Sequence, residues 1–456
     1  MKQNRMKATR IAIATLFGAV GALTALPACA ETEVEALKRE LAEQRALIEK
    51  LLAAQASQQE AIKKIEARPE QAPAQASNNA VELPKGLTLY GTMDVNIASN
   101  NSGYGRKTTI GSGGMNSSSL GVKGQKELMD GVRLVGQLEM GIDFSTGIAG
   151  NGNKPDGANK TKSSSGGLDG TGAQLFSRQA YAGIATDKFG QITLGRQYSG
   201  SYIATAVLGT AFGSGFYGSS ATFLPIIGGE PTRLNNAAVY RSPTFSGFSA
   251  QATYTTGNEN NVNSTIVSGC NTASCVTDSS GKGWDAALTY QDKKLTGIVT
   301  SWHIKQATFD RLHGETGLAT KTGWQAVASY DFGFAKLYGN YISGKISGGN
   351  YQNVTKTLSK ANGWTVSASV PFGKHTILVG YTKLDDKSQL NRDGKQIGIA
   401  YTYRIQDTTW LYINYGKQIN DRNSDYSLMN GGDLVGLIAK PGYDASGVMM
   451  GVNTKF

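Results

Sequence analysis

The chain has 456 residues, and 45 Lys and Arg against 34 Asp and Glu give it a formal net charge of +11 at pH 7. Such a basic balance raises the question of nucleic-acid binding, but no Lys and Arg cluster with interleaved aromatic residues occurs, so we expect no nucleic-acid partner. The three histidines have no nucleophile or metal-ligand spacing and no G-x-S-x-G elbow is present, so we expect no enzyme, no metal and no cofactor.

The N-terminus has the three parts of a secretory signal peptide. Four basic residues precede an apolar run over residues 11–26, and Ala28-Cys29-Ala30 then fits an A-x-A cleavage site. The run is shorter than the ~20 residues that a membrane-spanning helix needs. We therefore predict a signal peptide over residues 1–30 rather than an anchor. Leu26-Pro27-Ala28-Cys29 also resembles a lipoprotein processing box, with Pro27 unusual there, so lipid attachment at Cys29 is the alternative.

Residues 31–68 change abruptly to Glu, Ala, Gln, Leu and Lys, without Gly or Pro. Position a of a heptad falls on Val34, Leu41, Ile48, Gln55 and Ile62, and position d on Leu37, Gln44, Leu51, Gln58 and Ile65. This pattern predicts a coiled-coil stalk about 57 Å long at ~1.5 Å per residue. A lone solvated helix is less favoured because the apolar seam is narrow and persistent. Residues 69–86 contain three prolines and are predicted to be a linker.

From Leu87 onward, apolar and polar residues alternate with a period of two. Charged residues such as Arg133 and Glu139 occur in mid-strand on the polar face, so this face should meet water. The apolar face recurs too often to be covered by one small sandwich core. Short connections alternate with long polar ones, as at the two rims of an outer-membrane barrel. We therefore predict an all-β fold, a transmembrane antiparallel β-barrel of about sixteen strands over residues 87–456.

An aromatic repeat supports this interpretation. Gly283-Trp284, Gly323-Trp324 and Gly363-Trp364 each open an alternating strand at intervals of 40 residues. One strand–turn–strand–loop unit per interval fits a meander, and tryptophans at strand starts suit an interfacial girdle. A soluble propeller has a similar period, but it needs no lipid-like face on every strand.

The connection 199–232 differs from the other predicted loops. Residues 199–229 carry no charge, and glycines, serines and Pro225 break any regular period. Five aromatic residues make the segment poorly suited to disorder, so we predict that it packs against another part of the protein.

Only Cys270 and Cys275 remain in the mature chain, in a polar loop between two predicted strands. In an exported protein such a pair predicts a small disulfide, and no His lies nearby to favour a metal site.

Six segments, in order along residues 87–456, together resemble the trimeric general porins of Gram-negative bacteria. They are LYGTMDVN, SLGVKGQKEL, RLVGQLEMGIDF, FSRQAYAGI, FGQITLGRQYSG and LNNAAVYRSPTFSGF. The last strand ends at Phe456 and looks like the C-terminal signature that the barrel-assembly machinery reads. The coiled coil before the barrel resembles the DcaP-like porins, a family associated with anionic and dicarboxylate solutes.

The resemblance implies a homotrimer in the outer membrane, in contact with its lipid and lipopolysaccharide, with a three-stranded coiled coil in the periplasm. It identifies residues 199–232 with the third loop, which in the family folds into the barrel and narrows the pore. Arg178 and Arg233 match basic wall positions that face this loop. The loop lacks the acidic cluster of the family and retains only Glu230.

Two further positions depart from the family. Ser119 and Thr92 stand where many relatives have Arg or Lys, so we expect them to be uncharged residues of the pore wall. Lys123 and Arg133 are expected to be inner-wall charges. Arg196 falls on the opposite parity from Gln197, and a subunit contact is one role open to it.

Electrostatics then predicts the direction of selectivity. Fixed charges act strongly in a narrow pore with low-dielectric walls. Four basic residues leave with the signal peptide, so the mature chain carries +7, and residues 71–456 carry +9. With Arg178 and Arg233 at the constriction, we predict a preference for small anions, carboxylates above all. For each arginine the plainer reading is an ordinary lumen or rim residue.

A structural protein is the rival from another class. A stalked barrel that tethers the outer membrane to the cell wall would act through its coiled coil and would need no open lumen. A porin, by contrast, should still conduct without its stalk.

Overall fold

The computed structural model describes residues 84–145, 147, 175–219, 231–257, 281–310, 315–347, 357–430, 433–434 and 439–456. The predicted signal peptide, the coiled coil and most of the linker lie outside these residues, as do Glu230, Cys270 and Cys275. What the sequence indicates for these segments stays a prediction.

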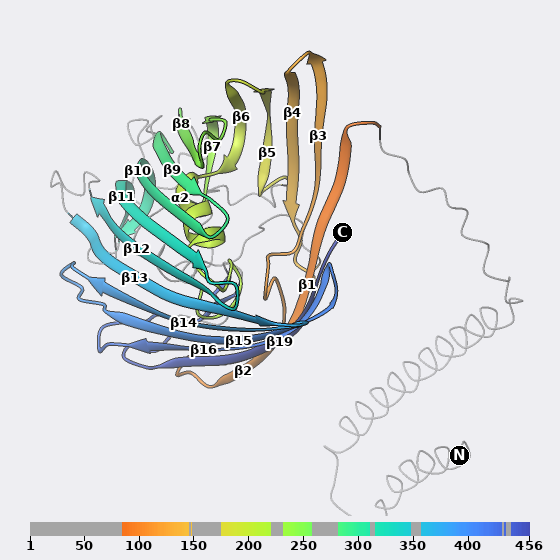
Figure 1. The fold of residues 1–456 in the computed structure, drawn as a ribbon. Coiled ribbons are helices and arrows are strands. Elements are labelled where there is room, and N and C mark those ends of the chain that lie inside the picture. The colour runs from red at the N-terminus through yellow and green to blue at the C-terminus, as the bar shows by residue number, and fades with distance from the viewer. Residues whose placement is uncertain are drawn as a thin grey trace, which may run out of the picture. The chain divides into compact units, whose positions relative to one another are not determined.

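The described residues form one closed antiparallel sheet (Figure 1). Its strands are β1 (Leu87–Asn101), β2 (Arg106–Ser112), β3 (Ser119–Met129), β4 (Val132–Gly141), β5 (Gln179–Thr186), β6 (Gly190–Tyr198), β7 (Arg233–Arg241), β8 (Phe248–Thr255), β9 (Gly283–Gln291), β10 (Leu295–Asp310), β11 (Glu315–Asp331), β12 (Lys336–Ser347), β13 (Thr357–Phe372), β14 (His375–Asp386), β15 (Gly394–Gln406), β16 (Thr409–Asn420) and β19 (Ala445–Lys455).

Two pairings close the barrel and set its size. Strand β19 pairs with both β16 and β1, so no edge is left open between the first and last strands. Strands β2 and β3 pair with successive stretches of the same edge of β1 and therefore occupy one strand position. The barrel thus has 16 strand positions, which confirms the predicted all-β architecture.

Besides the barrel strands, the described residues form a short α-helix, α2 (Gly200–Ile203), a turn of π-helix, η1 (Ala204–Leu208), and a two-stranded pair, β17 (Met429–Asn430) with β18 (Asp433–Leu434). None of the helices in these parts of the chain is long and apolar enough to cross a membrane.

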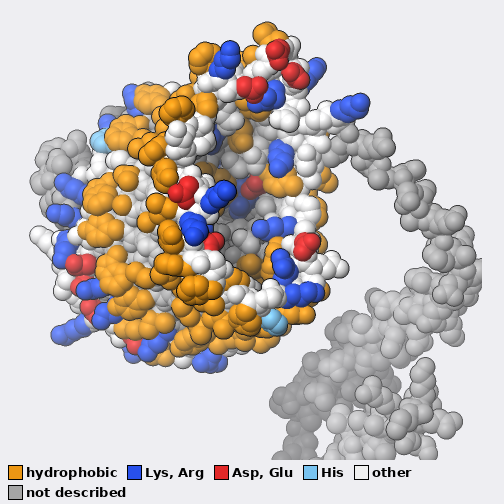
Figure 2. Space-filling model, in the orientation of Figure 1, with side chains coloured by type: hydrophobic (Ala, Val, Ile, Leu, Met, Phe, Trp, Pro, Cys, Tyr) orange, Lys and Arg blue, Asp and Glu red, His pale blue; other side chains and the backbone are white. Residues whose placement is uncertain are grey.

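The two faces of each strand meet different surroundings. On β1, Asp94 and Asn96 point inward and are buried, whereas Met93 and Ile97 point outward and are 43% and 54% exposed. Hydrophobic side chains cover the outer wall of the barrel (Figure 2). Polar side chains thus lie inside and apolar ones outside, the reverse of a soluble protein. A barrel with a polar lumen and an outer wall in hydrocarbon requires this arrangement.

The two rims differ as the sequence predicted. Turns of two to six residues join strands at one rim, for example Phe332–Ala335 between β11 and β12, where Gly333 adopts φ +89°. Glycine takes this left-handed conformation without steric cost, which allows the tight turn. Longer connections, such as those between β4 and β5 and between β6 and β7, join the strands at their other ends, and in outer-membrane barrels this rim is extracellular.

Aromatic side chains form bands on the outer face. Trp324 stacks obliquely on Tyr341 and Trp364 on Tyr381, with ring centroids 5.3 Å apart in both pairs. These residues lie five to eight residues from the short-turn ends of their strands. At the short-turn rim, Tyr330 contacts Phe332 with centroids 4.7 Å apart. Two such bands are typical of the membrane–water interfaces of a barrel.

The C-terminus lies beside β1 (Figure 1). The Gly91 amide donates to the Phe456 carbonyl at 3.0 Å, and the Phe456 amide donates back to Gly91 at 3.2 Å. A Cβ on Gly91 would lie 2.4 Å from the Phe456 ring, so the glycine leaves room for the terminal side chain to lie across β1.

Candidate functional site

The chain after β6 folds back inside the barrel, and we call residues 199–219 the inner loop (Figure 1). Its start is bound to β9 through Asp285, whose side chain is 1% exposed. The carboxylate accepts from the Gly200 amide at 2.6 Å, from the Ser201 amide at 3.2 Å and from the Ser201 hydroxyl. Bonds to a charged acceptor are stronger than neutral ones, so Asp285 holds the first turn of the loop against the wall.

The far end of the inner loop is seated on a row of glycines. Four of them pair directly across neighbouring strands on the lumen face, and we call this row the glycine track: Gly380, Gly398, Gly416 and Gly447. A Cβ on Gly398 would lie 2.6 Å from the Cα of Gly218, and one on Gly416 would lie 2.3 Å from the Cβ of Tyr217. The Tyr217 amide also donates to Asn414 at 2.7 Å. The missing side chains therefore create the space that the loop occupies.

An apolar cluster completes this seat. Phe212, Phe216 and Tyr217 of the inner loop are buried with inward-facing residues of β14, β15, β16, β19 and β1. The Phe216 ring meets Tyr412 edge-on, with centroids 5.2 Å apart. Aromatic burial supplies a large apolar area per residue, so this cluster is the main hydrophobic attachment of the loop.

A second inward segment supports the inner loop from the side of β1. Between β2 and β3, the backbone amides of residues 114–116 donate to the carboxylate of Asp94 at 2.8 to 2.9 Å. Asp94 is fully buried and also accepts from the Tyr412 hydroxyl at 2.6 Å. This segment touches the loop, because a Cβ on Gly215 would lie 2.6 Å from the Gly114 carbonyl oxygen.

The two arginines predicted for the constriction meet around one aromatic ring. Tyr198, at the end of β6, stacks on Tyr202 of the inner loop with centroids 5.1 Å apart. The guanidinium carbon of Arg233 lies 4.7 Å from the centre of the Tyr198 ring, and its Nη2 donates to the Tyr198 hydroxyl at 3.0 Å. The guanidinium carbon of Arg178 lies 5.9 Å from the same ring.

The two arginines differ in their counter-charges. Arg178 forms an ion pair with Glu139 of β4, which is buried on the lumen face. Among the described residues, Arg233 forms no ion pair, and its side chain is 8% exposed. The charge of Arg178 is thus compensated by a direct ion pair, whereas Arg233 interacts with the same carboxylate only through space.

Glu139 is held by neighbours from three strands. The Tyr90 hydroxyl donates to its Oε2 at 2.6 Å, and the Tyr181 hydroxyl donates to Gln137 beside it at 2.8 Å. A Cβ on Gly121 would lie 2.4 Å from the Tyr90 ring, so this glycine lets Tyr90 cross β3 to reach the carboxylate. Sequence reasoning placed Glu139 on the polar face of its strand but did not recognise its pairing with Arg178.

The predicted wall residues all lie on the lumen face. Thr92 pairs directly with Ser119, and Lys123 pairs with Gln137 of β4. The ammonium of Lys123 lies 5.4 Å from the centre of the Tyr90 ring. Arg133 lies near the short turns and forms an ion pair of 2.8 Å with Asp187.

Two more arginines belong to this part of the wall. Arg196 donates to the Ser177 carbonyl at 2.7 Å and to Asn235, so its contacts are within the chain. Arg241 pairs with Gln191 on the lumen face and donates to Gln251 at 3.0 Å. Sequence reasoning missed Arg241, although the alternation in LNNAAVYR places it on one face with Val239.

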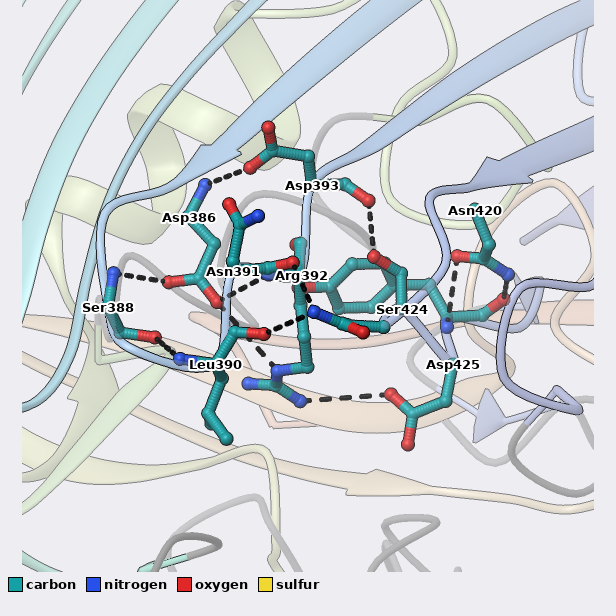
Figure 3. Close-up of polar contacts among 11 residues, drawn as sticks. Asp386, Ser388, Leu390, Asn391, Arg392, Asp393, Asn420, Ser424 and Asp425 are labelled. Carbon is teal, nitrogen blue, oxygen red and sulfur yellow. Dashed lines mark hydrogen bonds and ion pairs between the residues drawn. The ribbon is translucent and has the colours of Figure 1, made fainter.

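A further polar network joins the connections that follow β14 and β16 (Figure 3). In the connection between β14 and β15, Asp386 accepts from the amides of Ser388 and Arg392 at 2.9 and 3.0 Å. The Arg392 side chain reaches across to Asp425, with 3.7 Å between Nη1 and Oδ1. Asn420 donates to the Tyr426 carbonyl at 2.7 Å. The network ties two long connections to each other at the long-loop rim.

Around the hollow that opens in Figure 2, Lys and Arg side chains gather with fewer acidic ones. The acidic residues nearest the inner loop are engaged. Asp94 and Asp285 are buried against backbone amides, and Glu139 is paired with an arginine. The charged side chains that remain around this hollow are therefore mainly basic ones.

The comparisons with known proteins agree on one family. A sequence profile described as Gram-negative porin matches residues 53–423. An outer membrane porin protein of Bordetella pertussis is 26% identical over 376 residues, which cover 74% of this chain and 89% of that relative.

Solved structures share the fold. An anion-selective porin from Comamonas acidovorans superposes with a TM-score of 0.60 at 21% identity, covering 81% of this chain and 99% of that one. The trimer form of OmpT of Vibrio cholerae has a TM-score of 0.58 at 15% identity, covering 81% and 99%. The outer membrane channel DcaP of Acinetobacter baumannii has a TM-score of 0.51 at 11% identity, covering 81% and 97%.

The profile match spans most of the barrel, and the closed sheet of 16 strand positions agrees with it. Porins are diffusion channels of the outer membrane and not enzymes, as was expected from the sequence. The chain belongs to the Gram-negative porin family.

Proposed function

We propose that this porin passes small hydrophilic solutes with a preference for anions, carboxylates and dicarboxylates above all. In this proposal the constriction lies between the inner loop and the wall that carries Arg178 and Arg233, and Glu230, in the predicted loop 199–232, is its acidic member. Arg233 is the observation that carries the proposal, because it is an inward cation with no acidic partner among the described residues.

The charges around the constriction support this direction. Asp94 and Asp285 are buried and bound by backbone amides, so they present little negative charge to a passing solute. Lys123 adds a cation on the same wall, while Thr92 and Ser119 line it without charge. Fixed charges in a narrow passage raise the local concentration of the opposite ion.

Similarity to other porins adds a weaker argument. The porin from Comamonas acidovorans is described as anion-selective, but at 21% identity the likeness shows the fold alone. The selectivity proposed for this chain therefore depends on its own residues.

Assembly and surroundings complete the proposal. We propose a homotrimer, as in the trimer form of OmpT, with a three-stranded coiled coil of residues 31–68 in the periplasm. The outer wall contacts membrane lipid and lipopolysaccharide. The C-terminal strand with Phe456 presents the signature that the barrel-assembly machinery reads.

The reversal potential of the purified protein in a planar bilayer under a potassium chloride gradient tests the proposal. We expect an anion-selective reversal that moves toward cations in Arg233→Ala and also in Arg178→Ala, because the second change leaves the Glu139 carboxylate without its partner. Arg106→Ala, which removes an exposed arginine of the outer face, is the control. A cation-selective wild type would reject the anion preference.

A further inference from the structure

Four lysines lie on the outer face of β12 to β15, near the long-loop ends of these strands. They form two directly paired positions, Lys345 with Lys360 and Lys383 with Lys395. All four side chains are exposed. Along each strand, the outward positions alternate with buried residues that point into the barrel, such as Ile342 and Leu384. We call this set the lysine belt.

Direct pairing of like charges is unfavourable. Opposed side chains on neighbouring strands have Cβ atoms only about 4.5–5.5 Å apart, and like charges at that distance destabilise a sheet. The lysine belt has two such pairs on four consecutive strands, and an anion bound between the lysines would remove this repulsion.

Nearby lysines on the same rim show the contrast. Lys387 forms an ion pair of 2.5 Å with Asp385, and Lys417 forms one of 3.1 Å with Asp444. Among the described residues, no lysine of the belt has a carboxylate partner. Carboxylates of the protein thus neutralise Lys387 and Lys417, whereas the lysine belt is free to bind an external anion.

The position of the belt in the membrane identifies the anion. Lys383 pairs directly with Trp364, and Lys345 follows Tyr341 on the same face by four residues, so the belt lies at the edge of the aromatic band. This band marks the membrane interface on the side of the long, extracellular loops. Lysine stems at such a place lie along apolar surface while the ammonium groups reach the headgroup layer.

We propose that the lysine belt binds the phosphate groups of a lipopolysaccharide headgroup in the outer leaflet. Lys360 and Trp364, the partner of Lys383, are four residues apart on β13, which separates the two lysine pairs by about 14 Å along the strand. Two separated cationic pairs suit a headgroup that carries two phosphates on a disaccharide. The proposal rests on the outer-membrane location and not on the selectivity of the pore.

A fourfold variant tests the belt, with Lys345, Lys360, Lys383 and Lys395 each changed to Gln. The control is the single variant Lys417→Gln, which removes a lysine of the same rim that already has an acidic partner. Binding of rough-type lipopolysaccharide and of its dephosphorylated form to the full-length protein in detergent is measured by native mass spectrometry.

We expect the fourfold variant to bind phosphorylated lipopolysaccharide at least about tenfold more weakly, because each lysine near an anionic lipid surface contributes to attraction. The control should bind within about twofold of the wild type. The dephosphorylated lipid should bind the wild type and the fourfold variant equally. Equal binding of the phosphorylated lipid to both proteins would overturn the proposal, and so would a smaller oligomer in the variant, which would assign this face to a protein interface.

A thermal measurement separates the belt from a purely structural role. Without lipopolysaccharide, the fourfold variant should unfold at the same or a higher temperature than the wild type, because the like-charge repulsion is gone. Phosphorylated lipopolysaccharide should raise the unfolding temperature of the wild type by more than that of the fourfold variant. A variant that unfolds at a lower temperature by the same amount in both conditions contradicts the proposal.

Discussion

Arg178 and Arg233 lie against the same tyrosine ring, but only one of them faces a carboxylate. A cation in direct contact with a buried carboxylate presents less net field to a solute than a cation without such a contact. At the scale of single residues, the selectivity that we propose therefore depends on Glu139 as much as on the arginines.

Glu139→Gln should increase anion selectivity because it leaves Arg178 uncompensated at nearly unchanged side-chain volume. One restored charge at roughly 8 Å from a solute is worth about 0.5 kcal/mol in water and about 2 kcal/mol at an effective dielectric constant of ~20. We expect the chloride-to-potassium permeability ratio to rise by about two- to thirtyfold, since each ~1.4 kcal/mol is a factor of ten.

The reversal potential under a salt gradient measures this ratio. Glu127→Gln is the control, since Glu127 also faces the lumen but lies beside the short turns. An unchanged ratio in Glu139→Gln would mean that the charge of Arg178 does not reach the solute path.

At the scale of elements, the inner loop depends on what the wall lacks. The glycine track leaves a groove across β14, β15, β16 and β19 in which the loop backbone lies. Apolar side chains then cover the loop, and Asp285 holds its beginning.

Gly398→Val should displace the end of the inner loop. The added side chain meets the backbone of Gly218 and Tyr217, which cannot move without the loop. Overpacking of this kind typically costs about 1–3 kcal/mol. We expect a larger and noisier single-channel conductance in planar bilayers.

Gly297→Val provides the matched control for this element, because a Cβ at Gly297 meets no atom within 4 Å. The control should conduct as the wild type does. A quiet channel of wild-type conductance in Gly398→Val would show that the glycine track does not hold the loop.

At the scale of the whole molecule, residues 71–456 carry a net charge of +9, and the screening of such charges depends on salt. The Debye length falls from about 10 Å at 0.1 M to about 3 Å at 1 M ionic strength. We therefore expect the anion preference to be strongest in dilute salt and to approach the free-solution mobility ratio near 1 M.

Reversal potentials at a constant concentration ratio, taken at several mean salt concentrations, check this dependence. A permeability ratio independent of salt would point to steric selection by the constriction in place of selection by charge.

The stalk is the other whole-molecule feature. Because β19 closes the barrel directly on β1, the channel needs no part of residues 31–68 to complete its wall. A variant lacking these residues should conduct with unchanged selectivity in planar bilayers. Loss of conductance in a correctly inserted barrel would instead favour a function that acts through the stalk, such as a tether to the cell wall.

Much of the barrel was predictable because the strand period is local. Alternation alone assigns Thr92, Ser119, Lys123 and Arg133 to the polar face, and the structure places them on the lumen wall. One residue in two is enough to define a face, whatever the register between strands. The strand number follows from the same pattern and from the alternating lengths of the connections.

The site depended on contacts between residues that are far apart in sequence. Glu139 and Arg178 are joined across the long connection between β4 and β5, and Asp285 binds the inner loop from a strand that begins about eighty residues later. The glycine track appears in sequence only as isolated glycines in four strands.

The sequence by itself determined the barrel and its two faces, because these follow from composition and from a period of two along each strand. Only the tertiary structure decided which cation is compensated, where the inner loop is seated and which lysines oppose each other on the outer face. Each of these depends on the register between strands and on the packing of a loop without a period. A one-dimensional pattern does not contain that information.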